Sequence, residues 1–144
     1  MFFFSSAPTP TPAPPQAVAA LVWALAGPPL LVFAATRVRR GRTSLHAGLM
    51  SASVVIELAV FTAFMFLMTP GGRRPMLLAL PFFKIHLTFA VAAFAGMAWQ
   101  LTSRAVARLR PYHRHAGPYV VLVWCLALLT GIYNYVFLYV MHTS

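Results

Sequence analysis

Residues 113–139 read HRHAGPYVVLVWCLALLTGIYNYVFLY, and this stretch sets the pattern for the whole chain. It begins with a basic collar that carries His113 and His115 and continues directly into an apolar segment. A transmembrane helix needs about 20 predominantly apolar residues to cross the ~30 Å hydrocarbon layer of a bilayer. The apolar segment has this length, and Pro118 suits the first turn of a helix, where a backbone N–H would have no partner. The stretch therefore predicts a membrane-spanning helix that begins near Pro118.

The composition of the whole chain is that of an integral membrane protein. Hydrophobic residues make up 60% of the 144 residues and charged residues only 8%, and the mean hydropathy is +0.78. These values do not fit a soluble domain. Apolar segments of spanning length lie between the basic clusters, at residues 17–36, 45–68, 76–103 and 118–141. We therefore expect an all-α fold, with one domain that forms a four-helix transmembrane bundle.

Prolines mark the amino-terminal part of the chain. Residues 1–16 alternate proline with alanine, threonine and serine, which favours an extended tail without a core of its own. This tail has no basic segment before its apolar residues, so it does not resemble a secretory signal peptide. Within the first predicted helix, Gly27, Pro28 and Pro29 predict a kink, because each proline removes a backbone donor. A membrane tolerates a kink where neighbouring helices satisfy the freed carbonyls, so we expect this helix to pack inside the bundle.

The charges predict how the chain lies in the membrane. The formal charge of +10 arises from eleven Lys and Arg residues and a single acid, Glu57. No basic globular surface with interleaved stacking aromatics is expected, which argues against nucleic-acid binding. By the positive-inside rule the two arginine-rich loops face the cytoplasm and contact lipid headgroups, and both termini lie on the other side. These arginines are Arg37, Arg39, Arg40 and Arg42 in one loop, and Arg104, Arg108, Arg110 and Arg114 in the other.

Glu57 and His86 are the ionisable residues expected deep within the spans. Glu57 lies ~16 Å along the second predicted helix from His46, and His86 lies about 14 Å from the opposite edge in the third. An ionisable side chain near the middle of the bilayer is costly unless it is paired or neutral. Glu57 and His86 could therefore meet, as a structural pair, a proton site or part of a metal site. A protonated Glu57 that hydrogen-bonds to a neighbouring helix is an equally good interpretation.

Three further histidines are expected together at the predicted cytoplasmic side: His46, His113 and His115. Two histidines that face each other across a four-helix bundle commonly hold a b-type haem, each giving one axial bond. His46 and His113 are the candidate pair, and His86 is a separate mid-membrane candidate. Histidines at a membrane surface that contact headgroups or water are the alternative interpretation. The lone Cys125 excludes an intramolecular disulfide and a CxxCH haem-attachment motif.

Helical spacing places many of the polar residues on shared faces. The second predicted helix carries His46, Met50, Ser53 and Glu57 on one stripe, and the fourth carries Trp124, Ala127, Gly131 and Asn134. Packing is the default explanation of such stripes. Copper or another metal could bind through Met50, Met97 and the histidines, although methionines are more often core or lipid-facing residues. The chain has no Ser/His/Asp set, paired carboxylates or glycine-rich phosphate loop, so a role other than an enzyme is favoured.

The stretch at residues 113–139 resembles the last span of a family of small four-helix bacterial membrane proteins, the CtaM-like maturation factors for haem-copper cytochrome oxidase. The run LHAGLM resembles the family's opening of helix two, and FKIHLTFAV resembles its helix three around a central histidine. The resemblance covers about residues 44–140, whereas the first helix and the tail match poorly. Glu57 departs from the family pattern, and His115 has no clear counterpart in it. The matching positions are His46, Met50, His86, His113-Arg114, Trp124, Thr130-Gly131 and Tyr135.

This resemblance implies a multi-pass protein of the bacterial inner membrane that is linked to haem-copper oxidase, as a maturation factor or a resident subunit. A larger respiratory complex is the implied partner, and b-type haem or a metal the implied cofactor, bound through His46, His113 and His86, the last with Glu57 as a metal site. The competing hypothesis is a cofactor-free accessory subunit whose proline tail docks on a larger complex. A third hypothesis is a proton or small-solute pathway through Glu57 and His86.

Overall fold

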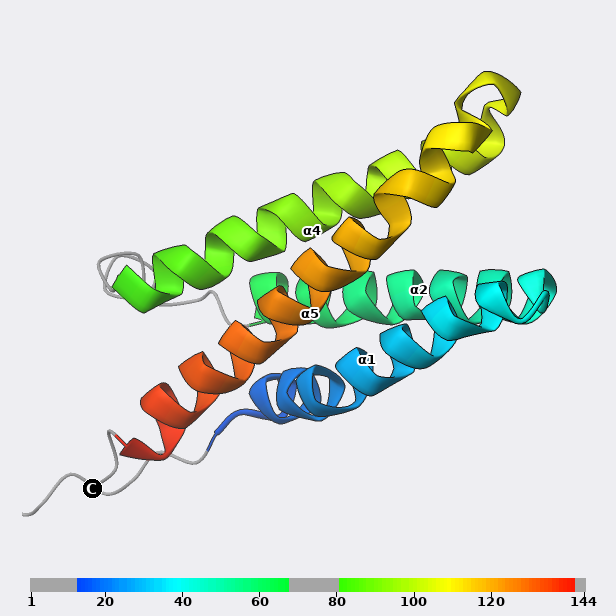
Figure 1. Cartoon of the computed structure of the whole chain (residues 1–144). Coiled ribbons are helices and arrows are strands. Elements are labelled where there is room, and N and C mark those ends of the chain that lie inside the picture. Colours follow the sequence, from blue (N-terminus) through cyan, green and yellow to red (C-terminus); the bar gives the residue numbers. More distant parts are fainter. Residues whose placement is uncertain (1–12, 68–80, 142–144) are drawn as a thin grey trace, which may run out of the picture.

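The computed structural model describes residues 13–67 and 81–141, and these residues are almost entirely helical (Figure 1). No strand occurs in the described ranges, which confirms the all-α prediction. The helices are α1 (Pro15–Arg39), α2 (Thr43–Leu67), α4 (Pro81–Ala105) and α5 (Arg110–Tyr139), with the short 3-10 helix η1 (Ala107–Leu109) before α5.

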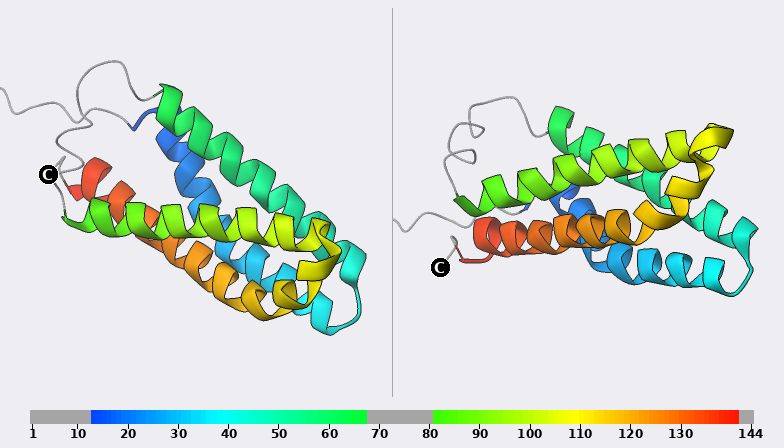
Figure 2. Two further views of the ribbon diagram at one scale, coloured as in Figure 1. Left: turned by 90° about the horizontal axis from the view of Figure 1, so that it is seen from above. Right: turned by 45° about the horizontal axis from the view of Figure 1, so that its top comes forward.

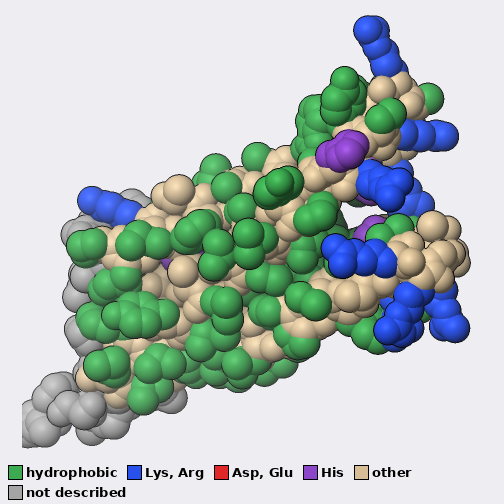
Figure 3. Space-filling model, in the orientation of Figure 1, with side chains coloured by type: hydrophobic (Ala, Val, Ile, Leu, Met, Phe, Trp, Pro, Cys, Tyr) green, Lys and Arg blue, Asp and Glu red, His purple; other side chains and the backbone are tan. Residues whose placement is uncertain are grey.

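Within the described residues, four segments are long and apolar enough to cross a membrane: α1, α2, α4, and η1 together with α5. Large apolar side chains cover the outside of all four helices, with Val22, Val55, Val91 and Leu122 more than half exposed (Figure 3). A surface of this kind suits hydrocarbon better than water. The prediction of four apolar helices of spanning length is therefore confirmed.

The boundary of the last helix differs from the prediction. α5 begins at Arg110, and Pro111 takes the position in its first turn that the sequence analysis gave to Pro118. Pro118 lies inside the helix, where it removes one backbone hydrogen bond. His113 and His115 are consequently helical residues rather than members of a preceding loop. Residues 76–80, which were expected to begin the third helix, and most of the predicted proline tail lie outside the described residues.

α1 stays helical through Pro28 and Pro29 and changes direction near them (Figure 2). The predicted kink is therefore present. Beside it, Gly27 lets α1 approach α5 closely, because a Cβ atom at this position would lie only 2.6 Å from Cδ1 of Leu128. Gly96 does the same between α4 and α5, where a Cβ atom would lie 2.9 Å from Cγ1 of Val120. Small residues at these contacts allow the close helix approach that van der Waals packing in a membrane requires.

The packed helix pairs are α1 with α2, α1 with α5, and α4 with α5. The buried core lies between them and is built around Trp23, Leu31, Met97 and Trp124. α2 also touches α4 through an edge-to-face contact of Phe61 and Phe94, whose ring centroids are 4.8 Å apart. α2 and α5 are not one of the packed pairs.

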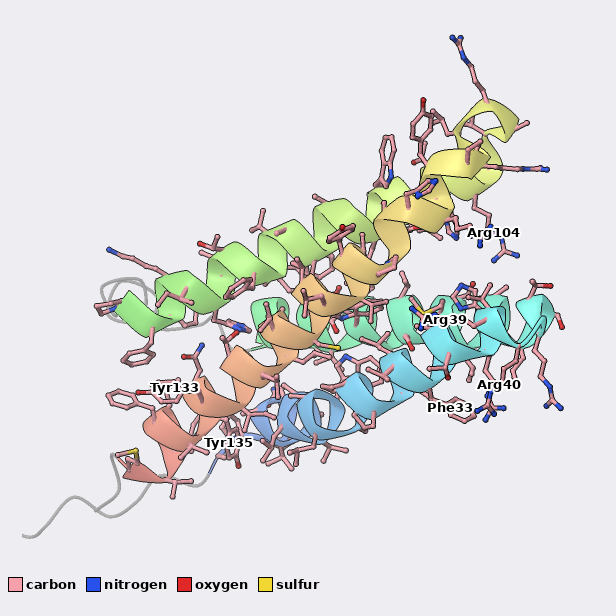
Figure 4. The ribbon with its side chains drawn as sticks, viewed as in Figure 1. Phe33, Arg39, Arg40, Arg104, Tyr133 and Tyr135 are labelled. Carbon is pink, nitrogen blue, oxygen red and sulfur yellow. The ribbon has the colours of Figure 1, made fainter. Side chains whose placement is uncertain are left out.

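The two ends of the bundle differ. At the end where the chain turns from α1 to α2 and from α4 to α5, the two hairpins diverge, and Arg side chains gather there (Figures 1 and 3). At the other end the helices stay together, and Tyr133 and Tyr135 project from opposite sides of α5 (Figure 4). Tyr133 packs edge-on against Phe82 there. Tyrosines at a helix end suit the membrane–water interface.

Candidate functional site

Glu57 is held by two tryptophans. Nε1 of Trp23 on α1 donates a 2.6 Å hydrogen bond to Oε2 of Glu57 on α2, and Nε1 of Trp124 on α5 donates a 2.9 Å hydrogen bond to the same oxygen. Both indoles are buried, with exposed fractions of 7% for Trp23 and 1% for Trp124. Two donated hydrogen bonds offset part of the cost of placing an acidic group in an apolar bundle. Glu57 thus accepts hydrogen bonds from the indoles of two neighbouring helices.

The Glu57–Trp124 bond sets the register between α2 and α5. Both helices run from the arginine-bearing end toward the other end (Figure 1). Eleven residues separate His46 from Glu57 on α2, and eleven separate His113 from Trp124 on α5. Eleven residues are about three turns and ~16 Å, so each histidine lies on the face of its bonded partner and at the same distance from it. The hydrogen bond therefore brings His46 and His113 to one level of the bundle.

His46 is oriented by the first helix. Its Nδ1 lies 2.9 Å from the backbone carbonyl oxygen of Ala34. A carbonyl can only accept, so Nδ1 is the donor, and in a neutral imidazole Nε2 then carries the lone pair. A histidine that ligates a metal commonly donates its other ring N–H in this way. The neutral form of His46 therefore has the tautomer of a ligand.

His113 is oriented in the same manner by α4. Its Nδ1 lies 3.2 Å from the carbonyl oxygen of Gln100 and 3.2 Å from Oγ of Ser103. The Ser103 hydroxyl itself donates to the Gln100 carbonyl, so the three groups form a closed cluster. Ser103 is fully buried, which fixes this cluster within the helix interface. As in His46, Nδ1 is the donor, and the neutral imidazole has its lone pair on Nε2.

His86 lies apart from this pair and contacts α5 deeper in the bundle. Its Nδ1 is 3.1 Å from the carbonyl oxygen of Ala127 and 3.1 Å from Oγ1 of Thr130. Gly131 leaves room for the ring, since a Cβ atom there would lie 3.3 Å from Cε1 of His86. The Thr130-Gly131 pair, noted in the sequence only as a motif, thus forms the surface on which the His86 ring packs.

The predicted metal site at His86 and Glu57 stays a prediction. Glu57 bonds to the two indoles and His86 bonds to α5, and these hydrogen bonds do not join the two side chains to each other. Within residues 13–67 and 81–141, no group of three or more His, Cys, Asp or Glu side chains is arranged to hold a metal ion. His115 is exposed on α5.

A hollow separates the two hairpins at the arginine-bearing end, with histidine side chains at its margin and Arg side chains around it (Figure 3). We call this region the mouth. Arg104 extends from the end of α4 toward the α1–α2 turn, where Arg39 and Arg40 lie (Figure 4). Several polar atoms are buried here without a hydrogen-bond partner, namely Nε of Arg37 and both side-chain amide atoms of Gln100. The mouth therefore combines two oriented imidazoles with the hydrogen-bond donors of its Arg side chains.

No protein-family model, curated protein or solved structure matches the chain. The resemblance of the sequence to the CtaM-like family accordingly stays a prediction.

The sequence indicates the histidines and Glu57 as candidates but not the residues that orient them. Trp23, Ala34 and Gln100 carry no recognisable ligand or catalytic pattern. The equal spacing of His46 to Glu57 and His113 to Trp124 was present in the sequence. It becomes informative only once Glu57 and Trp124 are known to touch.

Proposed function

We propose that this chain binds b-type haem between His46 and His113, and that it serves haem-copper cytochrome oxidase as a maturation factor or resident subunit. The haem proposal is carried by one observation: the Glu57–Trp124 hydrogen bond, which joins two helices of the same direction at equal distances along the chain from His46 and His113. The association with an oxidase is supported only by the resemblance of residues 44–140 to the CtaM-like family.

The residues of the mouth fit a haem in three respects. Axial ligation of a b-type haem uses neutral imidazole nitrogens, and both Nε2 atoms have the required tautomer because Nδ1 donates to a backbone carbonyl. Haem carries two propionates, and guanidinium groups bind carboxylates well. The only acid in the chain is Glu57, which lies about three turns away, so no carboxylate of the chain competes for these arginines.

Each protein group has a defined task in this proposal. The carbonyls of Ala34 and Gln100 hold the imidazole rings, the arginines of the mouth would pair with the haem propionates, and apolar residues of the diverging helices would exclude water. Haem, when bound, supplies an iron centre that changes its charge by one electron. A maturation factor would hold haem as cargo, and a resident subunit would retain it for electron transfer.

The arginine-bearing end is proposed to face the cytoplasm of a bacterium, with both termini on the opposite side of the inner membrane. Single cysteines at the exposed positions Arg40 and Arg108, in a Cys125→Ala background, test this orientation. A membrane-impermeant maleimide should label both in inverted vesicles and neither in intact spheroplasts. Labelling in spheroplasts would reverse the orientation.

A reduced-minus-oxidised visible spectrum of the purified protein tests haem binding. We expect the spectrum of a low-spin b-type haem, whose bands disappear or become high-spin in His46→Ala and in His113→Ala. His115→Ala is the matched control, because His115 is exposed on the same helix, and His86→Ala tests whether the deeper histidine contributes. Absence of haem bands from protein purified with haem added, or equal spectra in the two mouth variants and the wild type, would contradict the proposal.

Purification from native membranes in mild detergent tests the partner. We expect haem-copper oxidase subunits to co-purify, and oxidase haem content to fall in a deletion strain that expresses His46→Ala. If the oxidase co-purifies and His46→Ala and His113→Ala fully complement, the cofactor-free accessory hypothesis replaces this one.

A further inference from the structure

We infer that Glu57 is a positioning residue for the mouth: its carboxylate ties together the two helices that carry His46 and His113 and fixes the separation of these histidines. The ligand role of the two histidines rests on the proposed function. The mechanical role of Glu57 is independent of it and can be measured without a cofactor.

The first reason is the absence of another extensive contact between the two helices. α1 packs against both α2 and α5, and α5 packs against α4, but α2 and α5 do not pack extensively against each other in the described part of the chain. The direct polar link between α2 and α5 is the hydrogen bond from Trp124 to Glu57. Without it, the register of the two helices would depend on their separate contacts with α1 and on the contact of α2 with α4 through Phe61 and Phe94.

The second reason is the convergence of two donors on one atom. Oε2 of Glu57 accepts from Trp23 and Trp124, so one oxygen joins α1, α2 and α5. An indole can only donate, and neither N–H has a second recorded acceptor. Removal of the acceptor therefore leaves two buried donors without partners, and relief of that cost requires the helices to move apart or admit water.

The third reason is the distance of the two histidines from the contact at Glu57. The hairpins are joined at the level of Glu57 and diverge toward the arginine-bearing end (Figure 1). His46 and His113 lie ~16 Å beyond the joint along their helices, so a small change in helix angle at Glu57 becomes a larger displacement at the histidines. Axial ligation requires both Nε2 atoms at bonding distance from one iron, so the haem site is sensitive to this displacement.

Four variants separate this role from a general contribution to packing. Glu57→Gln retains an oxygen that accepts both indoles, whereas Glu57→Leu removes the acceptor at similar volume. Trp124→Phe breaks the link between α2 and α5, whereas Trp23→Phe breaks only the link between α1 and α2. Trp99→Phe, at an exposed tryptophan on α4, is the control for loss of an indole.

Pulsed electron–electron double resonance measures the distance between two spin labels, here one label near each of the mouth histidines. The labels are placed at Ser44 and Tyr112, both exposed and next to the mouth histidines, in a Cys125→Ala background without haem. We expect the same distance distribution in the wild type, Glu57→Gln and Trp99→Phe, and a longer or broader one in Glu57→Leu and Trp124→Phe. Trp23→Phe should change it less than Trp124→Phe. An unchanged distribution in Glu57→Leu that retains wild-type helicity would overturn the inference.

Haem titration of the same variants tests whether the positioning role of Glu57 serves the haem site. Its outcomes distinguish the haem proposal from the role of Glu57. We expect the Kd for haem to rise about tenfold in Glu57→Leu and Trp124→Phe, and Glu57→Gln to restore the wild-type value. If the distances change as expected but no variant binds haem, the proposed function fails and the role of Glu57 stands. If all variants bind haem equally while the distances change, the inference that Glu57 serves the haem site is wrong.

Discussion

Nε1 of Trp124 and Oε2 of Glu57 lie 2.9 Å apart, and this contact joins residues 67 positions apart in the chain. Trp124 belongs to a stretch that looks like an ordinary membrane anchor, and Glu57 is the only acid in the sequence. Their hydrogen bond connects the two hairpins near the middle of α2 and of α5 and gives His46 and His113 a common level.

Loss of the Glu57 acceptor should destabilise the fold. We expect Glu57→Leu to lower the free energy of unfolding by about 2–4 kcal/mol, because two buried indole donors lose their partner. Glu57→Gln should lose less, since its side-chain oxygen still accepts. Reversible unfolding in mixed micelles with increasing denaturing detergent measures both. Equal stability of the leucine variant and the wild type would show that the two hydrogen bonds contribute nothing net.

Substitution of Gly96 should disturb the interface of α4 and α5. A Cβ atom at Gly96 would lie 2.9 and 3.0 Å from the two Cγ atoms of Val120, and a valine in a helix has little freedom at χ1 to move them away. We expect Gly96→Ala to cost about 1–3 kcal/mol. The matched control is Gly48→Ala on α2, where a Cβ atom meets open space and replacement of glycine in a helix should stabilise by about 0.5–1 kcal/mol. The same unfolding assay should give opposite signs for the two variants.

The position of His86 should respond to Gly131 without effect on the mouth. Gly131→Ala places a Cβ atom 3.3 Å from Cε1 of His86, so the ring has to shift by a few tenths of an ångström. We expect the NMR signal of the His86 Cε1–H group to move, and those of His46 and His113 to stay in place. A change in the haem spectrum of this variant would instead indicate that His86 communicates with the mouth.

The tautomers of the histidines can be observed directly. In protein without haem, at alkaline pH where imidazoles are neutral, ¹⁵N NMR should show the proton on Nδ1 in His46, His86 and His113, because each Nδ1 donates to a backbone carbonyl. Exposed His115 should show the tautomer mixture of a solvated imidazole and serves as the internal control. A proton on Nε2 of His46 or His113 would mean that the ring is not presented as a ligand.

The stripe of α5 shows which features helical periodicity predicts and which it does not. Spacing placed Trp124, Ala127, Gly131 and Asn134 on one face, and Trp124, Ala127 and Asn134 are indeed buried. It did not show what the face contacts. Thr130 and Gly131 contact the ring of His86, and Trp124 donates a hydrogen bond to Glu57. These partners lie on other helices, at separations that no local pattern encodes.

The four apolar helices, the bend at Pro28 and Pro29, and the gathering of arginines at one end can all be predicted from local sequence. Apolar length sets a span, a helix satisfies its own backbone hydrogen bonds, and proline acts on the turn that contains it. The partners of Glu57 and the common level of His46 and His113 follow instead from tertiary packing. Both depend on which helices pack together and in what register, and that choice is made by contacts such as the one between Glu57 and Trp124.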